Sequence, residues 1–154
     1  MDLARAKLLA TLAAGALISS PALKAQAYYE YDGTYATDAK GVRHSYQEYP
    51  RHRPPWVDDQ IKAFAPHYSY QDRAAHHQGH GFFRIMIDLK TGSVVTIAIV
   101  KSTGFKTLDD SAVQALRKWC WKPGKWKEVD VPVTYVIGAR RSTPPRAVPL
   151  PSRW

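Results

Sequence analysis

The 154-residue sequence contains a single cysteine, Cys120. One cysteine excludes an intramolecular disulfide framework and any zinc or iron–sulfur site built from several thiolates. Acidic residues are also few, with 13 Asp and Glu against 22 Lys and Arg, which gives a formal net charge of +9. This excess favours acidic partners such as anionic lipid, cell-wall polymers or nucleic acid, but it selects none of them.

The sequence has no apolar run close to the roughly 20 residues that a stable transmembrane helix needs. An apolar stretch at residues 8–18 follows a short basic start, and Ala25-Gln26-Ala27 has the small-x-small form of a signal-peptidase site. We therefore predict that residues 1–27 are a signal peptide and that the chain is exported after cleavage at Ala27. The alternative is an uncleaved helical anchor that extends to Leu23.

The two ends of the exported chain show little periodicity. Residues 28–65 begin with several tyrosines. They also contain a basic segment at residues 51–55, where two prolines restrict the backbone. We predict a mostly irregular tether there, with one or two helical turns at residues 56–64. Residues 139–154 carry four arginines and four prolines, which predicts a disordered basic tail.

Residues 66–138 carry nearly all of the regular pattern. Residues 82–89 alternate apolar and polar, as in a strand with one buried face, and the β-branched stretch 94–100 completes a hairpin. Residues 129–137 alternate again and predict a third strand.

A helix is predicted between the hairpin and the third strand. Thr107 is its expected N-cap, and Pro123-Gly124 is expected to stop the helix. Five apolar residues fall on one face of this helix: Leu108, Ala112, Ala115, Leu116 and Trp119. The predicted order is strand, strand, helix, strand, preceded by a short helix near residues 71–77.

An ordered set of short motifs runs through the same region: Pro66-His-Tyr-Ser-Tyr70, Gly92-Ser-Val94, Lys101-Ser-Thr-Gly104, Ala115-Leu-Arg-Lys-Trp119, Trp121-Lys-Pro-Gly124 and Val131-Pro-Val-Thr-Tyr135. With these gaps, residues 66–138 resemble the C-terminal domain of the TonB energy-transducer family. The resemblance implies an α+β fold, a three-stranded antiparallel sheet (β-β-α-β) with one main helix packed on one face.

The resemblance also implies a function without catalysis. In that family the domain lies in the periplasm and adds the N-terminal segment of an outer-membrane receptor to its sheet as a strand. The strand addition couples inner-membrane energy to transport across the outer membrane. The implied partner is thus a TonB-dependent receptor, and inner-membrane motor proteins join it if the chain is anchored.

The front end of the chain departs from the family pattern of a membrane helix and a long Pro-rich spacer. Residues 28–65 span at most about 125–135 Å when extended and about 35 Å as a flexible coil. We therefore favour a free periplasmic module over a short anchored transducer. A different alternative is a structural envelope protein that dimerises and is held to the cell wall or anionic lipid by its basic arms.

Four histidines are candidate ligands for Zn²⁺, Ni²⁺ or Cu²⁺: His67, His76, His77 and His80. The other interpretation is a solvated loop ahead of the first strand. No carboxylate or thiol lies at ligand spacing beside them, so we expect no metal and no cofactor.

Two further functions have rival interpretations. Ser102 and Asp109 with a histidine would make a triad, but the sequence lacks a nucleophile elbow, so we expect no enzyme. Trp119, Trp121 and Trp126, interleaved with lysines, suggest either a nucleic-acid stacking platform or core packing, and we expect packing and no nucleic acid.

Cys120 is expected to be a small packing residue, although an exposed thiol would allow a cross-linked dimer.

The binding edge is predicted on the third strand. A right-handed crossover places residues 129–137 beside the first strand and leaves their other side free to accept a peptide strand. Pro132 fits such an edge because proline has no donor to lose there. The predicted partner-binding edge comprises Asp130, Pro132, Thr134, Tyr135 and Val136. The alternative is that the chain's own tail or a second copy of the domain closes it.

Overall fold

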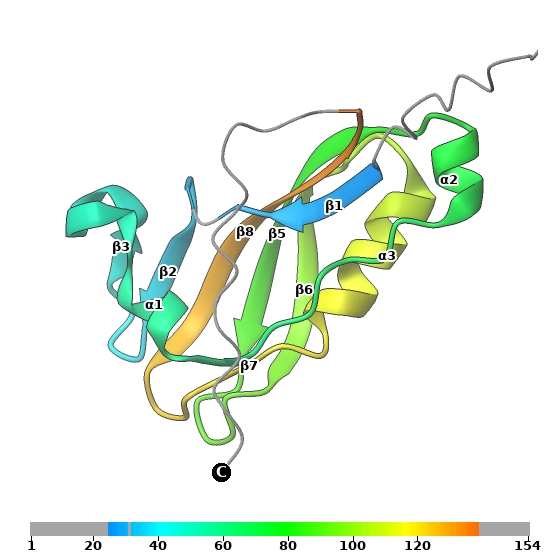
Figure 1. The fold of residues 1–154 in the computed structure, drawn as a ribbon. Coiled ribbons are helices and arrows are strands. Elements are labelled where there is room, and N and C mark those ends of the chain that lie inside the picture. The colour runs from blue at the N-terminus through cyan, green and yellow to red at the C-terminus, as the bar shows by residue number, and fades with distance from the viewer. Residues whose placement is uncertain (1–24, 31, 139–154) are drawn as a thin grey trace, which may run out of the picture.

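A computed structural model describes residues 25–30 and 32–138 (Figure 1). The predicted signal peptide up to residue 24 and the predicted tail at residues 139–154 lie outside the described residues. Within the described residues, no helix is both long and apolar enough to cross a membrane. The elements are β1 (Ala25–Tyr29), β2 (Tyr35–Asp38), β3 (Arg43–Ser45), two 3-10 turns (Tyr46–Glu48 and Pro50–His52), α1 (Pro55–Asp58), β4 (Gln60–Lys62), α2 (Tyr70–Ala74), β5 (Gly79–Ile87), β6 (Val94–Lys101), α3 (Lys106–Leu116), β7 (Cys120–Trp121) and β8 (Trp126–Ile137).

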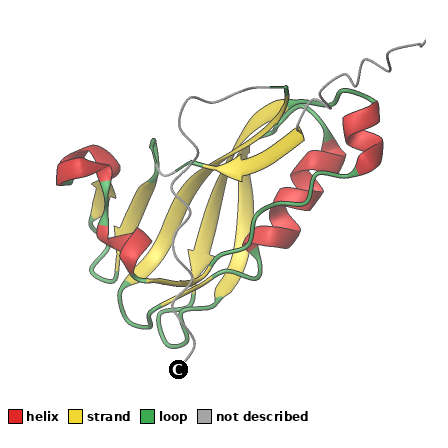
Figure 2. Cartoon of the chain, viewed as in Figure 1, coloured by secondary structure: helices red, strands yellow, loops and turns green. Residues whose placement is uncertain are grey.

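One antiparallel sheet of six strands dominates the fold, in the order β3-β2-β8-β5-β6, with β1 also paired to β8. Helix α3 packs on one face of the sheet, and β4 and β7 form a separate small ribbon (Figures 1 and 2). The α+β class is confirmed, as are the hairpin β5–β6 and the position of β8 beside β5. The prediction of a three-stranded sheet is wrong, because three further strands join it.

The added strands come from the segment expected to be an irregular tether. Residues 28–65 hold β2, β3, β4, α1, two 3-10 turns and the last two residues of β1, so the segment is more regular than predicted. These strands are three to five residues long. An alternation of polar and apolar residues becomes readable over about 4–8 residues, so strands this short leave almost no sequence pattern.

The core lies between α3 and the sheet. Of the predicted helical face, Leu108, Ala112 and Leu116 are fully enclosed against Phe83 and Ile85 of β5. The predicted end of the helix is wrong, because α3 ends at Leu116, before Trp119 and Pro123. The predicted N-cap is wrong, because the helix begins at Lys106 after Phe105. The hydroxyl of Thr107 instead donates to Asp72 of α2.

Tryptophan side chains extend this core beneath the N-terminal segment. Trp56, Trp119, Trp121 and Trp126 are at most 6% exposed. Their indole nitrogens are used internally: Trp56 donates to Thr34 Oγ1, and Trp121 donates to the carbonyl of Trp56. The packing interpretation of the tryptophans is therefore confirmed, and residues 34–59 belong to the same folded unit as α3 and β8.

Candidate partner-binding edge

The predicted binding edge of β8 is covered along its length. On one side β8 pairs with β5, as predicted. On the other side, β1 pairs with residues 133–137 and β2 pairs with residues 126–130. The prediction that this edge is open is therefore wrong for the described structure, since strands upstream of the domain close it.

Pro132 lies where the two covering strands meet. Its carbonyl accepts a hydrogen bond from the backbone N–H of Glu30 at 3.2 Å, so its backbone points away from β5. Because ladder bonds alternate along an antiparallel pair, the register then makes Thr134–Tyr28 and Val136–Gln26 the hydrogen-bonded pairs. The backbone groups of Pro132, Thr134 and Val136 thus point away from β5, and their partners belong to the chain itself.

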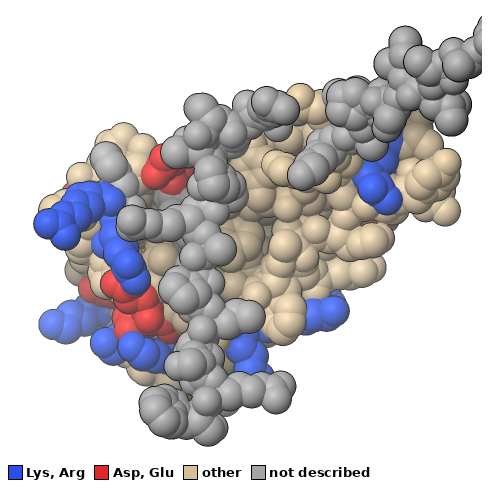
Figure 3. Space-filling model, viewed as in Figure 1, with Lys and Arg blue, Asp and Glu red and all other residues tan. Residues whose placement is uncertain are grey.

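Ion pairs fix the β2 half of this edge. Asp130 is 1% exposed. Arg84 of β5 donates two hydrogen bonds to the carboxylate of Asp130, from Nε at 2.8 Å and from Nη2 at 2.9 Å. Arg43 of β3 adds a bond from Nη2 at 2.6 Å and also contacts Glu128. Hydrogen bonding to Asp130 raises the pKa of Arg84 above its ordinary value. Charged side chains gather over β2, β3 and α1 in Figure 3.

The β1 half is packed differently. Ala25, Ala27 and Tyr29 point to the helix-covered face and are partly buried there, while Gln26 is exposed. The ring of Tyr29 lies edge-on to Trp119, with centroids 4.5 Å apart. The surface over β1 and α3 is largely free of charge in Figure 3. Small apolar side chains and one aromatic contact therefore accompany the backbone pairing of β1.

Tyr135 belongs to the core rather than to a partner surface. Its side chain is fully buried, its hydroxyl donates to the carbonyl of Leu108 at 2.9 Å, and its ring lies 5.2 Å from that of Tyr68. Burial raises the pKa of Tyr135 to about 12. Of the predicted edge residues, Asp130, Thr134 and Tyr135 thus have side chains engaged within the domain.

Strand β6 is the end of the sheet that the sequence analysis did not consider. Within the described residues it pairs on one side only, with β5. Register shifts leave Val95 and Val100 as extra residues at its two ends, and these side chains are 69% and 52% exposed. Such bulges interrupt the ladder and make a strand a poorer template for edge pairing.

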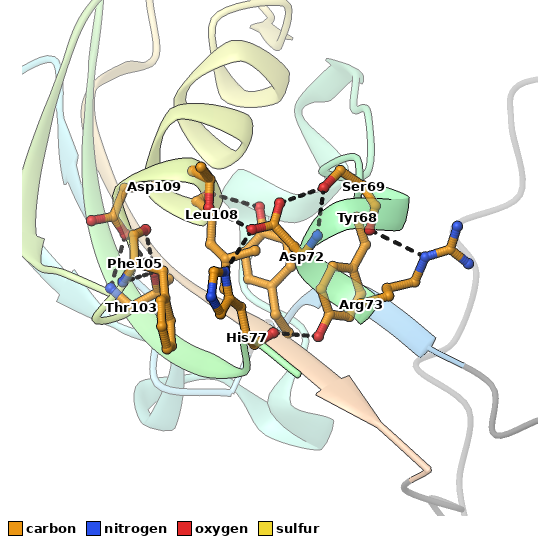
Figure 4. Close-up of polar contacts among 11 residues, drawn as sticks. Tyr68, Ser69, Asp72, Arg73, His77, Thr103, Phe105, Leu108 and Asp109 are labelled. Carbon is orange, nitrogen blue, oxygen red and sulfur yellow. Dashed lines mark hydrogen bonds and ion pairs between the residues drawn. The ribbon is translucent and has the colours of Figure 1, made fainter. Parts of the chain in front are cut away.

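His77 and His80 have different polar partners, and Figure 4 shows the contact that His77 makes. His77 Nδ1 lies 2.9 Å from the carboxylate of Asp72, and its ring stacks on Phe105 at 4.1 Å. His80 Nδ1 instead lies 2.7 Å from Thr134 Oγ1. The described residues contain no group of three or more His, Cys, Asp or Glu that could hold a metal ion.

Asp72 is the centre of a polar cluster that joins α2 to α3. Burial alone would raise its pKa, but bonds from Ser69, Thr107 and His77 outweigh burial and lower the pKa of Asp72. His77 lies in the loop ahead of β5, as expected, but its side chain is bonded to Asp72 and is only partly exposed to solvent. Asp109 plays a similar local role, since it accepts bonds from Ser102 and Thr103 and fixes the β6–α3 loop.

The family model for the C-terminal part of the Gram-negative bacterial TonB protein matches residues 65–138. This part of the chain belongs to the TonB C-terminal domain family. Searches among curated proteins and among solved structures give no match. The family segment contains β5, β6, α3 and β8, whereas β1, β2 and β3 precede it. The strands that cover β8 therefore lie outside the segment that the family model matches.

Membership gives the general role of the domain. TonB family proteins are periplasmic and transmit energy to outer-membrane receptors with which they interact.

Proposed function

We propose that this protein is a free periplasmic module that binds the N-terminal segment of a TonB-dependent receptor as an added strand along residues 132–137 of β8. The single observation that supports this site best is β1 itself. An extended five-residue strand already pairs there in antiparallel register, so the edge has the geometry that strand addition requires.

The two strands that cover the edge, β1 and β2, differ in how easily a partner could displace them from β8. Release of β2 would separate Arg43 from the buried carboxylate of Asp130, and breaking a buried ion pair is costly. Release of β1 withdraws two alanines and one tyrosine from the core. We therefore expect the receptor segment to replace β1 and to leave β2 in place, so Asp130 takes no part in binding.

Binding of this kind uses backbone hydrogen bonds and needs no catalytic group. The signal-peptide-like start supports delivery to the periplasm, where the receptor segment is accessible. The protein would then act as a non-enzymatic partner in energy-dependent transport across the outer membrane.

Amide hydrogen exchange on the full chain, produced without export so that residues 25–27 are retained, tests the site. A synthetic peptide of the N-terminal segment of a receptor from the same genome should displace β1, so the amides of Gln26 and Tyr28 should exchange about tenfold faster or more. The amides of Thr134 and Val136 should stay protected because the peptide takes over their bonds. The β2 amides serve as the internal control and should not change. Protection gained along β6 with β1 undisturbed, or no change at saturating peptide, would contradict this assignment.

A further inference from the structure

We propose that the slot beside residues 133–137 selects its partner by side-chain size, requiring two small residues at alternate positions and an aromatic ring two residues further on. The inference rests on the proposed function and specifies the segment that β8 takes. Residues 25–29, with the sequence Ala-Gln-Ala-Tyr-Tyr, are the chain's own occupant of this slot and a model of its partner.

The first requirement follows from what lies opposite the alanines. Ala27 pairs with Tyr135, and Ala25 pairs with Ile137. The side chain of Tyr135 is fully buried, with its ring against Tyr68 and its hydroxyl bound to the carbonyl of Leu108. A longer side chain at position 27 would enter this packed layer, and overpacking a filled core is unfavourable. The slot therefore accepts small residues at these two positions.

The second requirement follows from Trp119. This side chain is 2% exposed, and the ring of Tyr29 covers it in an edge-to-face contact. A partner strand with a small residue at the position of Tyr29 would leave the indole of Trp119 exposed to solvent. An aromatic residue at that position restores both the burial of Trp119 and the ring contact. Trp119 therefore acts as the anchor point for an aromatic residue of the partner.

The backbone limits the register and length of the pairing. The residue after the aromatic donates its N–H to the carbonyl of Pro132, as Glu30 does, and receives no bond in return because proline has no N–H. Beyond this point the edge is taken by Tyr35 of β2, opposite Asp130. The partner thus pairs over about six residues, antiparallel to β8. Its residue equivalent to Gln26 faces solvent and is unrestricted.

Removal of the signal peptide is expected to change how much of this slot β1 occupies. Cleavage after Ala27, as the sequence predicts, removes three of the five residues of β1 and leaves Tyr28 and Tyr29. The slot is then unoccupied in a larger fraction of processed chains than of unprocessed chains, and we call this the open fraction. Apparent affinity for a partner rises in proportion to that open fraction.

The test uses the full chain, produced without export so that residues 25–27 are retained, and a synthetic peptide of residues 22–31 as the probe. Ala27→Glu places a charge in the packed layer and should expel β1, whereas the matched control Gln26→Glu places the same charge on the exposed face. Calorimetric titration should show the peptide binding Ala27→Glu about tenfold more tightly or better than it binds Gln26→Glu. Equal affinity for the two variants would overturn the proposal.

Substituted peptides then test the size rule on the Ala27→Glu chain. Changing the peptide residue Ala27→Leu or Tyr29→Ala should weaken binding at least about fivefold, and Gln26→Leu should leave it unchanged. If Ala27→Glu does not unfold cooperatively, Gln26→Pro replaces it, because proline removes a donor opposite Val136. Loss of the size preference while a receptor peptide still displaces β1 would refute this inference alone. Failure of the receptor peptide to displace β1 would refute the proposed function.

Discussion

Trp119→Ala is expected to lower the free energy of unfolding by about 3–5 kcal/mol, a large share of the stability of a domain of this size. Trp119 is 2% exposed, its ring contacts Tyr29 and Trp121, and its indole N–H donates to the carbonyl of Phe64 at 2.9 Å. The substitution therefore leaves a cavity and an unpaired carbonyl at the point where α3, β1 and the segment before α2 meet. Urea unfolding followed by far-UV circular dichroism measures the loss.

His77→Ala is expected to lower the free energy of unfolding by less than Trp119→Ala does. A histidine in a solvated loop would cost almost nothing to remove, but His77 bonds Asp72 and stacks on Phe105, so we expect a loss of about 1–2 kcal/mol. A loss below about 1 kcal/mol for Trp119→Ala, or a larger loss for His77→Ala, would contradict the packing described for α3.

Arg84→Met is expected to destabilise the protein by about 2–3 kcal/mol. Removing one partner of a buried ion pair costs about 3–5 kcal/mol, and the expected value is smaller here because Arg43 still holds Asp130 and the Arg84 side chain is 34% exposed. The measurement is again chemical denaturation, combined with amide exchange along β2. These amides should exchange faster, because the carboxylate that ties β3 to β8 has lost its bidentate partner.

Lys127→Met is the matched control for Arg84→Met, since Lys127 is an exposed cation on β8 and is next in sequence to Glu128. Its effect should lie within about 0.5 kcal/mol of zero. Equal effects of the two substitutions would show that Asp130 does not depend on Arg84, and the assignment of β2 as the fixed half of the edge would fail.

The elements that the sequence predicted correctly are those with long periodic patterns. Strands β5 and β8 are nine and twelve residues long, and α3 presents one apolar face, so the hairpin, the helix and the neighbouring position of β8 and β5 were all readable. The direction of Pro132 was also predictable, because a residue without an N–H fits best where a ladder bond is dispensable.

The closure of the edge was not predictable from the same signals. Strands β1, β2 and β3 are short, and what holds β2 in place is a charge pairing between Arg43 and Asp130, 87 positions apart in the sequence. The alternation that identified β8 describes its two faces and carries no information about its lateral neighbours. The tyrosines near the start of the exported chain were a signal that was not used, since Tyr29 and Tyr35 lie in the two covering strands.

Photocrosslinking in intact cells tests the central claim most directly. A photoreactive residue at Val136, on the half of β8 that β1 covers, should crosslink to the N-terminal segment of an outer-membrane receptor. The same residue at Val95, 69% exposed on β6, should give no receptor crosslink. Receptor crosslinks from Val95 and none from Val136, or crosslinks from Val136 only to a second copy of this chain, would contradict strand addition at β8.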